Sequence, residues 1–439
     1  MNVVVESQEL VRTLTISDEG DKVKGIFDEV LSEISKVANI PGFRKGNVPK
    51  NIVKARYKDE IKEEVARNYV NRYLNEILER EGLKPVVQEV LFGEVELEED
   101  EKLKFKVSFE VAPEFELKPY EGIEVETIKA EVKEEDIQKA IQNIKERNAK
   151  YELADKEVET TDQVKIKYFI ESRSGEKEED EFETVIGSGT LRPEIEEQLK
   201  GKKAGDKVVL EDAPLYNQKG EEIGRARIEI EILEVRKKVL PEFNDEFVKS
   251  INLGENVEEA REKIRKQIED QIKSLQNQDI QQKILNKLVT EYDFPVPNSI
   301  LEKEFENLVN RYAQQLESYG IKPNRDMINA ARESLLKTAT NNVRVMFILT
   351  KIAEKENIEL TDEEIDQQLQ NLSKAYNTSP DELKRYLEEK NMMEGIKSDI
   401  RRQKALDLIT KKANIKELSK EELEQSIKQQ EEKVEEKNG

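Results

Sequence analysis

The sequence contains no histidine, no cysteine and no tryptophan. Without histidine and cysteine the chain cannot build a Ser-His-Asp triad, a Cys-His pair, a redox-active thiol or the usual zinc sites. It also lacks the phosphate-binding patterns G-x-x-x-x-G-K-[ST] and G-x-G-x-x-G, which disfavours nucleotide hydrolysis. We therefore expect no metal and no other cofactor. The absence of cysteine, and hence of disulfides, suits the reducing cytoplasm.

Long apolar runs are missing as well. No stretch approaches the ~20 apolar residues that a membrane-spanning helix needs. The segment from Met1 to Ser7 has no basic region followed by an apolar core, so it does not read as a signal peptide. The sequence predicts a soluble, cytoplasmic protein with no membrane partner.

Aromatic residues are scarce, at 6%, whereas charged residues make up 38% of the chain. The formal net charge of −23 repels phosphate, which disfavours general coating of nucleic acid but leaves room for a local basic patch that docks on RNA. A chain of 439 residues indicates about three domains at roughly 150 residues each. The high charge content favours an extended molecule with several small cores over one thick core.

The N-terminal part, residues 1–115, has the pattern of an α+β domain. A strand is predicted over Val3–Ser17, followed by a helix whose apolar residues recur at i, i+3, i+4 and i+7 from Val23 to Val37. A second helix is predicted over 59–81. Strict alternation of apolar and polar residues over 103–111 then predicts a strand in a sheet with one wet face.

The middle of the chain reads as short strands separated by glycine turns. Strands are predicted over 164–170, 207–210 and 226–235, and Ile228 and Ile230 share one face of the last strand with Ile232. A charged connector over 116–149, part strand and part helix, precedes them.

The C-terminal part is almost wholly helical, and Pro295 and Pro297 break the helical pattern. Asn256, Thr361 and Ser379 are predicted helix caps because each is followed three residues later by glutamate. The fold class is therefore α+β multidomain, with an α+β head, a small β-rich domain and an elongated all-α C-terminal domain. Helices are predicted over 299–318, 326–355, 362–375, 381–389 and 393–413; the predicted domains are 1–115, the linker 116–149, 150–240, 241–418 and a charged tail 419–439.

A basic segment stands out against the acidic background. Residues 42–58 contain six cations and no anion. Gly42 and Gly46 flank Phe43, Arg44 and Lys45, and a proline at position 49 closes the segment, which predicts an exposed turn. An arginine beside an exposed phenylalanine offers a fork for phosphate or carboxylate next to an apolar anchor. Taken alone, the pattern also fits a solvated basic loop whose Phe43 folds back onto the core.

The pattern Gly-Phe-Arg-x-Gly-x-x-Pro, placed after an amphipathic helix, resembles the ribosome-binding signature of bacterial trigger factors. The order of domains and the length of the chain agree with that family. The resemblance implies an ATP-independent chaperone that docks at the ribosome exit tunnel, on a ribosomal protein and adjoining RNA, and shields nascent and unfolded polypeptides. It also allows a weak homodimer of the free protein. The positions that match the signature are Gly42, Phe43, Arg44, Gly46 and Pro49, and the docking residues implied are Phe43, Arg44 and Lys45.

Residues 150–238 resemble an FKBP-type prolyl isomerase domain. Rotation about an X-Pro bond faces a barrier of ~18–20 kcal/mol, and a dry pocket that prefers the twisted imide lowers it without acid, base or metal. The chain departs from the family pattern, since Ile195 and Ile228 stand where aromatic residues are usual and the connection after the strand of Tyr168 is short. The alternative is that these residues only fill a small barrel core. The pocket implied by the resemblance is lined by Tyr168, Phe182, Val185, Ile186, Leu191, Ile195 and Tyr216.

The helices after residue 241 combine modest apolar stripes with very polar faces. Such helices favour arms that enclose a cavity for unfolded chains, although most single apolar positions fit interhelical core equally well. Two other functions remain open. One is a free cytosolic prolyl isomerase and holdase without ribosome docking. The other is a coiled-coil scaffold, which Pro295, Pro297 and Pro380 disfavour because they interrupt the heptads.

Overall fold

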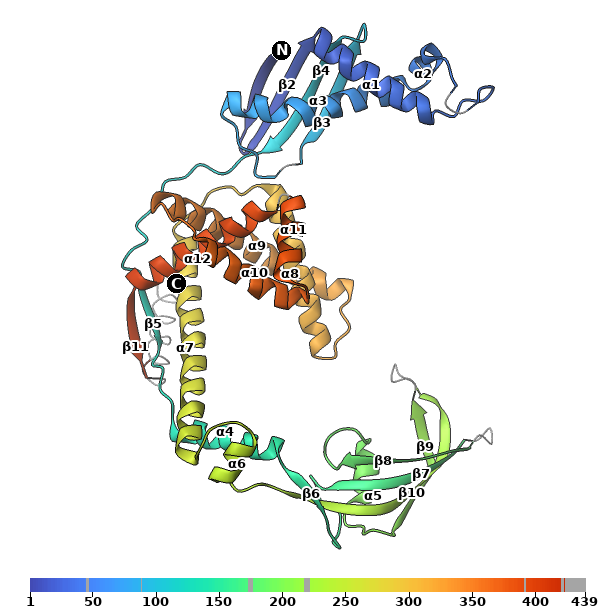
Figure 1. The fold of residues 1–439 in the computed structure, drawn as a ribbon, viewed down its shortest axis with the longest axis vertical. Helices are drawn as coiled ribbons and strands as arrows, with labels where there is room; N and C mark the ends of the chain where they lie inside the picture. The colour runs from blue at the N-terminus through green and yellow to red at the C-terminus, as the bar shows by residue number, and fades with distance from the viewer. Residues whose placement is uncertain are drawn as a thin grey trace, which may run out of the picture. The chain divides into compact units, whose positions relative to one another are not determined.

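The computed structural model describes residues 1–44, 47–87, 89–172, 177–216, 222–390, 392–419 and 422. The chain forms two compact units. One unit comprises Met1–Ile128 together with the chain from Gln278 onward, and the other comprises Lys129–Asn277. Helices and strands are both present, with the C-terminal part largely helical (Figure 1), which confirms the α+β multidomain class. The domain boundaries given above stay predictions.

The N-terminal segment, residues 1–111, which we call the head, is a four-stranded antiparallel sheet with the order β1-β2-β4-β3. Leu14 and Ile16 of β2 alternate with threonines and point into the core together with Phe105 and Val107 of β4, so one face of the sheet is apolar and the other polar. Two helices cover the apolar face. The elements are β1 (Asn2–Gln8), β2 (Val11–Glu19), α1 (Asp21–Val37), α2 (Lys50–Arg56), α3 (Lys58–Glu81), β3 (Leu91–Glu98) and β4 (Lys102–Glu110).

The predicted single strand over Val3–Ser17 is wrong, because the chain folds there into a hairpin. Gln8 pairs with Val11, which leaves a two-residue turn at Glu9 and Leu10. Glu9 has a φ of 49°, in the left-handed region that glycine and asparagine usually occupy in such turns. Since neither residue is present, the sequence carries no turn signal at this point.

A buried hydrogen bond links helix α3 to the sheet of the head. Tyr69 of α3 is fully buried, and its hydroxyl donates a hydrogen bond of 2.6 Å to Asp18 of β2. The Tyr69 ring meets Phe105 edge-on at 5.8 Å between centroids. The stripe of α1, from Val23 to Leu31, packs into the same core. The segment between α1 and α2 is therefore presented from a firmly packed base.

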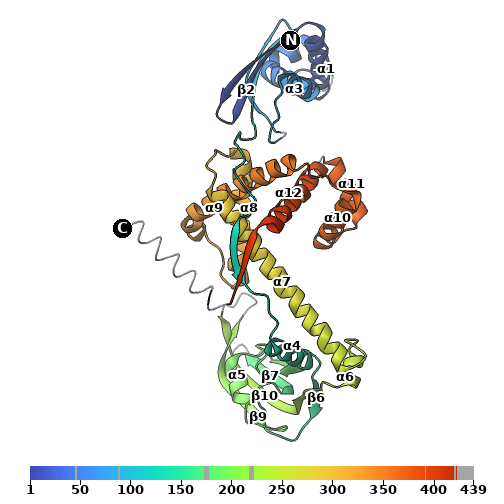
Figure 2. The same cartoon turned by 90° about the vertical axis from the view of Figure 1, so that its left-hand side faces the viewer.

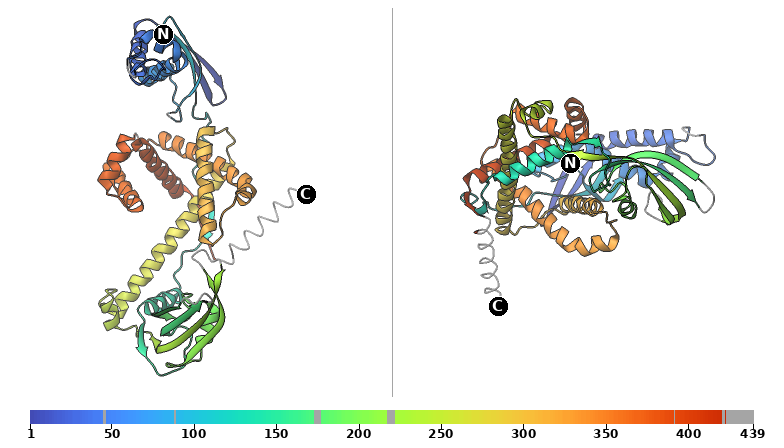
Figure 3. Two further views of the ribbon diagram at one scale, coloured as in Figure 1. Left: turned by 90° about the vertical axis from the view of Figure 1, so that its right-hand side faces the viewer. Right: turned by 90° about the horizontal axis from the view of Figure 1, so that it is seen from below.

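The second unit contains a curved five-stranded sheet, which we call the β-rich module and which Figure 3 shows in green. The long strand β10 pairs with β6, β7 and β9, and β8 pairs with β7. Ile228, Ile230 and Ile232 are buried on one face of β10, which confirms the predicted alternation. The elements are β6 (Lys150–Leu153), β7 (Gln163–Ser172), β8 (Lys177–Val185), α5 (Pro193–Leu199), β9 (Lys207–Tyr216) and β10 (Glu222–Val239); α4 (Glu134–Arg147) and α6 (Asp245–Ser250) also belong to this unit.

The helical part, which we call the body, follows the predicted pattern closely. The predicted caps are confirmed, since the backbone N–H groups of Glu259, Glu364 and Glu382 donate to the side chains of Asn256, Thr361 and Ser379. Figure 2 shows α10 and α11 beside α12, and the three helices contact one another. The helices are α7 (Val257–Thr290), α8 (Asn298–Ser318), α9 (Arg325–Lys355), α10 (Asp362–Tyr376), α11 (Pro380–Glu389) and α12 (Met393–Lys412).

The connector contributes a strand and a helix, as predicted, and its first half packs into the core of the body. Phe115, directly before the connector, stacks on Phe294 at 4.2 Å between ring centroids, and Tyr120 and Val125 of the connector are buried in the same core. The connector strand β5 (Glu124–Ile128) pairs in parallel with β11 (Asn414–Leu418), a strand that the sequence pattern did not predict. Within the part of the chain described here, no helix is long and apolar enough to cross a membrane. Apart from Ser419 and Glu422, the predicted tail 419–439 lies outside the described residues.

Candidate functional site

The basic segment forms the connection between α1 and α2 of the head. Gly42 has a φ of +92°, a conformation that glycine adopts readily and other residues rarely do. The Phe43 N–H donates to the Ile40 carbonyl at 3.1 Å, so the chain turns just before the phenylalanine. Phe43 is 40% exposed and Arg44 is exposed beside it. The phenylalanine therefore lies at the surface, and the alternative in which it folds back into the core does not describe this turn.

The far side of the turn leads into α2. The Asn47 N–H donates to the Arg44 carbonyl at 2.9 Å, and Pro49 occupies the position before the first residue of α2. Val48 is buried, which anchors this end of the segment to the head core. Lys45, a predicted docking residue, and Gly46, which matches the signature, lie outside the described residues.

The cations of the basic segment differ in how they are held. Lys54 forms an ion pair with Asp100 and lies over the Phe27 ring, so it is part of the packing of the head. Among the residues that the structure describes, Arg44, Lys50 and Arg56 form no ion pair with a carboxylate. These three side chains are exposed and keep their charge available for an anionic surface.

The β-rich module carries an apolar pocket of about 300 Å³ on its curved sheet. Tyr168 and Phe182 form an aromatic corner, with ring centroids 5.8 Å apart and an angle of 73° between the rings. Helix α5 closes one side, since Ile195 and Leu199 anchor it in the module core. The pocket is lined by Ile166, Tyr168, Ile170, Phe182, Leu191, Arg192, Ile195, Pro214, Leu215, Ile228 and Ile230.

Two polar groups, the Tyr168 hydroxyl and the Arg192 guanidinium, belong to the otherwise apolar lining of the pocket. The Tyr168 hydroxyl lies 3.4 Å from Glu178 Oε1, and burial together with the carboxylates of Glu178 and Asp180 raises the pKa of Tyr168 above its ordinary value. This hydroxyl therefore stays protonated at neutral pH and can donate a hydrogen bond. Across the pocket, Arg192 Nη1 donates to the Pro214 carbonyl at 2.7 Å.

The residues predicted for this pocket fall into three groups. Tyr168, Phe182, Leu191 and Ile195 line it, and so does Ile228, which stands where the resemblance leads us to expect an aromatic residue. Ile186 is buried in the module core and Val185 is half-buried beside it, and neither is among the lining residues. Tyr216 ends β9, and its side chain lies outside what the structure describes.

Sequence reasoning missed three kinds of lining residue. Ile166 and Ile170 flank Tyr168 at two-residue spacing on β7, a signal that alternation alone could have given. Pro214 and Leu215 come from the second half of β9, beyond the predicted strand 207–210. Arg192 carries no sequence signal for a place in an apolar pocket.

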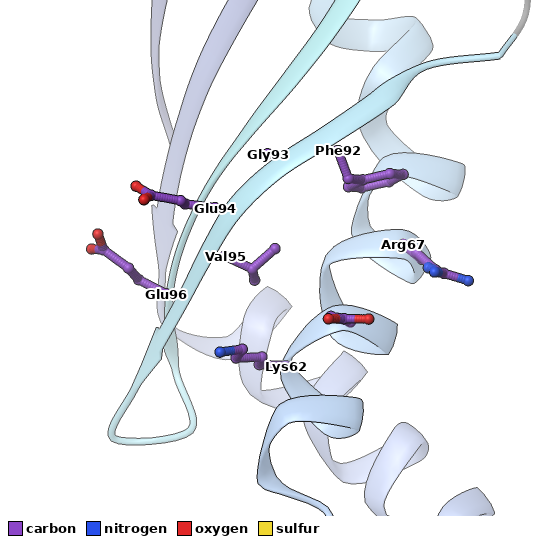
Figure 4. A pocket seen from close by; sticks show the side chains of 8 residues that line it. Lys62, Arg67, Phe92, Gly93, Glu94, Val95 and Glu96 are labelled. Atoms are coloured by element: carbon purple, nitrogen blue, oxygen red, sulfur yellow. The ribbon is translucent and has the colours of Figure 1, made fainter.

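A larger hollow, of about 620 Å³, lies on the head between α3 and β3. Figure 4 shows Phe92 and Val95 of β3 directed toward the helix, whereas Glu94 and Glu96 point away from it. Arg67 and Lys62 lie on the helix side. Because the walls carry charges of both signs, they do not select one class of ligand.

The turn offers an exposed ring and exposed cations, and the pocket offers apolar walls, so both can bind other molecules. In the ranges that the structure describes, no three acidic side chains gather in a way that would hold a metal ion. The exposed cationic turn and the apolar pocket define the class, a multidomain protein with candidate binding surfaces on separate folded parts. The large helical body fits this class, because much of its mass lies in helices with polar outer faces.

Comparisons with known proteins identify the family within this class. Residues 1–144 match the model for bacterial trigger factor protein, and residues 256–411 match the model for its C-terminus. The chain is 40% identical to a trigger factor of Aquifex aeolicus over 93% of this chain and 86% of that one, and 30% identical to a trigger factor of Koribacter versatilis over 93% and 95%. The protein belongs to the trigger factor family of chaperones.

A solved structure, "Promiscuous Substrate Recognition in Folding and Assembly Activities of the Trigger Factor Chaperone", supports the fold. It aligns with a TM-score of 0.51 at 24% identity, and the match covers 94% of this chain and 99% of that one. The two matched family ranges leave residues 145–255 between them, so the β-rich module and its pocket lie outside both.

Proposed function

We propose that this protein is an ATP-independent cytoplasmic chaperone that docks at the ribosome exit tunnel and shields nascent polypeptides. The observation that carries the proposal is the turn at Phe43 and Arg44, where an apolar ring is exposed beside cations without ion-pair partners among the described residues. An exposed phenylalanine loses stabilising burial unless a partner covers it. Aromatic and arginine side chains are also the groups that dominate binding energy at interfaces. Family membership supports the same function.

Co-sedimentation with bacterial ribosomes tests the docking. The intact chain is compared with Phe43→Ala/Arg44→Ala/Lys45→Ala, and with Leu91→Ala/Arg67→Ala as a matched control. Leu91 is 77% exposed and Arg67 is exposed, so the control removes an apolar group and a cation elsewhere on the head. We expect salt-sensitive pelleting that the triple variant loses and the control keeps. If the intact chain does not pellet, the alternative of a free isomerase and holdase takes its place.

The pocket supports a second activity, prolyl cis-trans isomerisation. Its apolar walls exclude water, which favours the twisted imide over the planar one because the planar amide loses more hydrogen bonding with solvent on entry. The Tyr168 hydroxyl, kept protonated, donates to Glu178 Oε1 over a long 3.4 Å, and in our proposal it turns this one proton to the carbonyl of a bound twisted imide. The residues at 195 and 228 are aliphatic, so we expect the acceleration to be modest.

A refolding assay limited by a slow X-Pro bond tests the isomerase. We expect the full-length protein to accelerate the slow phase, and Tyr168→Ala/Phe182→Ala to remove the acceleration. Lys237→Ala, on the exposed end of β10, serves as the control. The absence of acceleration by the intact protein would remove the isomerase activity and leave the docking proposal untouched.

The body supports the binding of unfolded chains. Large apolar side chains are exposed near helix ends, among them Tyr319 at 73% and Tyr376 at 72%. Scattered apolar contacts among charges suit weak binding of many different segments. We expect the protein to slow aggregation of a denatured client without ATP, and Tyr319→Ser/Tyr376→Ser to weaken that effect. Equal protection by the variant would show that these side chains are not used.

A further inference from the structure

A buried carboxylate lies on α5 next to a residue of the pocket lining. Glu196 is only 9% exposed, and it is not among the residues that line the pocket, whereas its neighbour Ile195 is. Within the described ranges no lysine or arginine forms an ion pair with Glu196. Burying a carboxylate without a cation costs free energy that an aliphatic side chain at the same position would not cost. The burial of Glu196 therefore calls for a reason other than packing of the module core.

The carboxylate accepts a hydrogen bond from a turn that leads into the pocket lining. The Gly187 N–H donates to Glu196 Oε1 at 3.0 Å. Gly187 opens the exposed turn 187–190, and the next residue, Leu191, lines the pocket. A hydrogen bond to a carboxylate is roughly twice as strong as one between neutral groups. Glu196 therefore links the turn before Leu191 to the helix that carries Ile195, and both of these side chains line the pocket.

The start of the same turn is held from a second side, by a strained segment before β7. Thr161 has a φ of 79°, a conformation that a β-branched residue rarely adopts. Its N–H donates to the Ile186 carbonyl at 2.8 Å, and the Ile186 N–H donates to the Asp162 carbonyl at 2.9 Å. Gly187 has a φ of +88°, and a Cβ there would lie 3.0 Å from Thr160 Cγ2. Because strained backbone persists only where its surroundings hold it, the chain at 186–187 is fixed in place.

Beyond Gly187 the turn is exposed and bonds to itself. The Ser188 and Thr190 hydroxyls lie 2.9 Å apart, and Gly189 between them is exposed as well. Among the described residues, the hydrogen bond from Gly187 to Glu196 is what joins this turn to α5. Without the Glu196 carboxylate the Gly187 N–H loses its acceptor, and Leu191 then follows a turn that can shift relative to α5.

We propose that Glu196 is a positioning residue for the pocket, which keeps Leu191 at a fixed place relative to Ile195. This inference rests on the proposed prolyl isomerisation. A pocket of fixed shape binds the twisted imide better than the planar one, whereas a pocket that adapts binds both equally and loses the advantage. Loss of the hydrogen bond should therefore lower kcat by about tenfold, while KM changes by less than about twofold.

Steady-state isomerisation of an Ala-Pro tetrapeptide by the full-length protein tests the inference, with kcat and KM measured separately. Glu196→Met has a similar length but no oxygen acceptor, and Glu196→Asp keeps the carboxylate on a side chain that is too short to reach Gly187 in the same way. Glu196→Gln keeps an oxygen acceptor at the right distance. Glu197→Met is the matched control, because it removes an exposed carboxylate of the same helix, one that pairs with Lys200.

We expect kcat to fall about tenfold in Glu196→Met and Glu196→Asp, and to stay within about twofold of the intact protein in Glu196→Gln and Glu197→Met. Thermal unfolding identifies variants that are folded at the assay temperature, and Glu196→Asp serves if Glu196→Met is not. An unchanged kcat in the folded variants without the hydrogen bond would overturn the inference and leave the isomerase in place. An equal loss in Glu196→Gln would also overturn it. The absence of catalysis by the intact protein would overturn the proposed isomerisation, and the positioning role with it.

Discussion

The turn at Phe43 and Arg44 and the pocket around Tyr168 use aromatic side chains in opposite ways. In the turn the Phe43 ring is 40% exposed, and the exposed Arg44 follows it in the chain. In the pocket the rings are partly buried against aliphatic side chains, and Arg192 is the only ionised residue among the described residues of the lining. The turn can bind only by lying against the surface of a partner. The pocket can enclose a side chain that enters it.

This difference separates the physical forces on which the two sites depend. Binding at the turn should weaken with salt, since exposed charges are screened within about 10 Å at 0.1 M salt. Binding in the pocket should depend mainly on apolar burial, which salt affects little. The two sites also lie in different units of the chain, so each should survive damage to the other.

The largest expected effect comes from the core beneath the pocket. Ile186 is 1% exposed, so Ile186→Ala should lower the free energy of unfolding of the β-rich module by about 2–5 kcal/mol. Peptide binding should fall with it, whereas ribosome binding should stay unchanged. Denaturant unfolding and co-sedimentation of the same samples check both outcomes. Leu153→Ala, at a residue that is 72% exposed, should change stability by less than about 0.5 kcal/mol.

The next effect concerns the turn alone. Phe43→Ala should weaken ribosome binding by about 10- to 30-fold, or ~1.4–2 kcal/mol, as expected for an aromatic anchor at an interface. Prolyl isomerisation by the same variant should equal that of the intact protein. Titration of labelled ribosomes measures the affinity, with Leu91→Ala as the control. An unchanged affinity would mean that the exposed ring is not an anchor.

Raising the salt concentration should weaken binding at the turn more than binding in the pocket, with a smaller effect than the substitution of Phe43. If Arg44 and one further cation each contact a phosphate, raising the salt from about 50 to 200 mM should weaken ribosome binding about tenfold. The affinity of the pocket for a neutral prolyl peptide should change by less than about twofold over the same range. Ribosome binding that ignores salt would contradict the role of the cations.

The smallest expected effect is the absence of a pH dependence. The chain has no histidine and no cysteine, and the raised pKa of Tyr168 keeps its hydroxyl protonated beyond its ordinary value near 10. Deprotonation of Tyr168 would remove the donor, so the rate should fall only above about pH 10. We expect kcat/KM for isomerisation to vary by less than about 1.5-fold between about pH 6 and 9. A bell-shaped profile in that range would show that another group takes part.

The sequence predicted the elements whose signals are local. The stripe from Val23 to Val37 gave α1 within two residues of its observed bounds, and the caps at Thr361 and Ser379 marked the starts of α10 and α11. The turn at Phe43 was also predicted, because its glycines, cations and proline form one contiguous pattern. Each of these features depends on neighbours in the chain.

The features that were missed depend on distant partners or on unmarked turns. Strand β11 follows the last helix of the body, whereas its partner β5 precedes the first helix of the body in the chain. No local pattern indicates a pairing between strands so far apart in the sequence. The turn at Glu9 has no glycine or asparagine to announce it. Arg192 and Pro214 meet across the pocket from α5 and β9, and composition alone gives no reason to join an arginine to an apolar site. Predicting the complete lining requires the register of the sheet.

The most direct test of ribosome docking places a photo-crosslinking amino acid at position 43 of the full-length protein, and at position 91 as the control. Both positions are exposed on the head, but only position 43 lies in the basic turn. The proposed docking predicts a crosslink from position 43 to a ribosomal protein at the tunnel exit, abolished by Arg44→Ala/Lys45→Ala and absent from position 91. Equal crosslinking from both positions, or none from position 43 on ribosomes that bind the protein, would contradict docking through this turn.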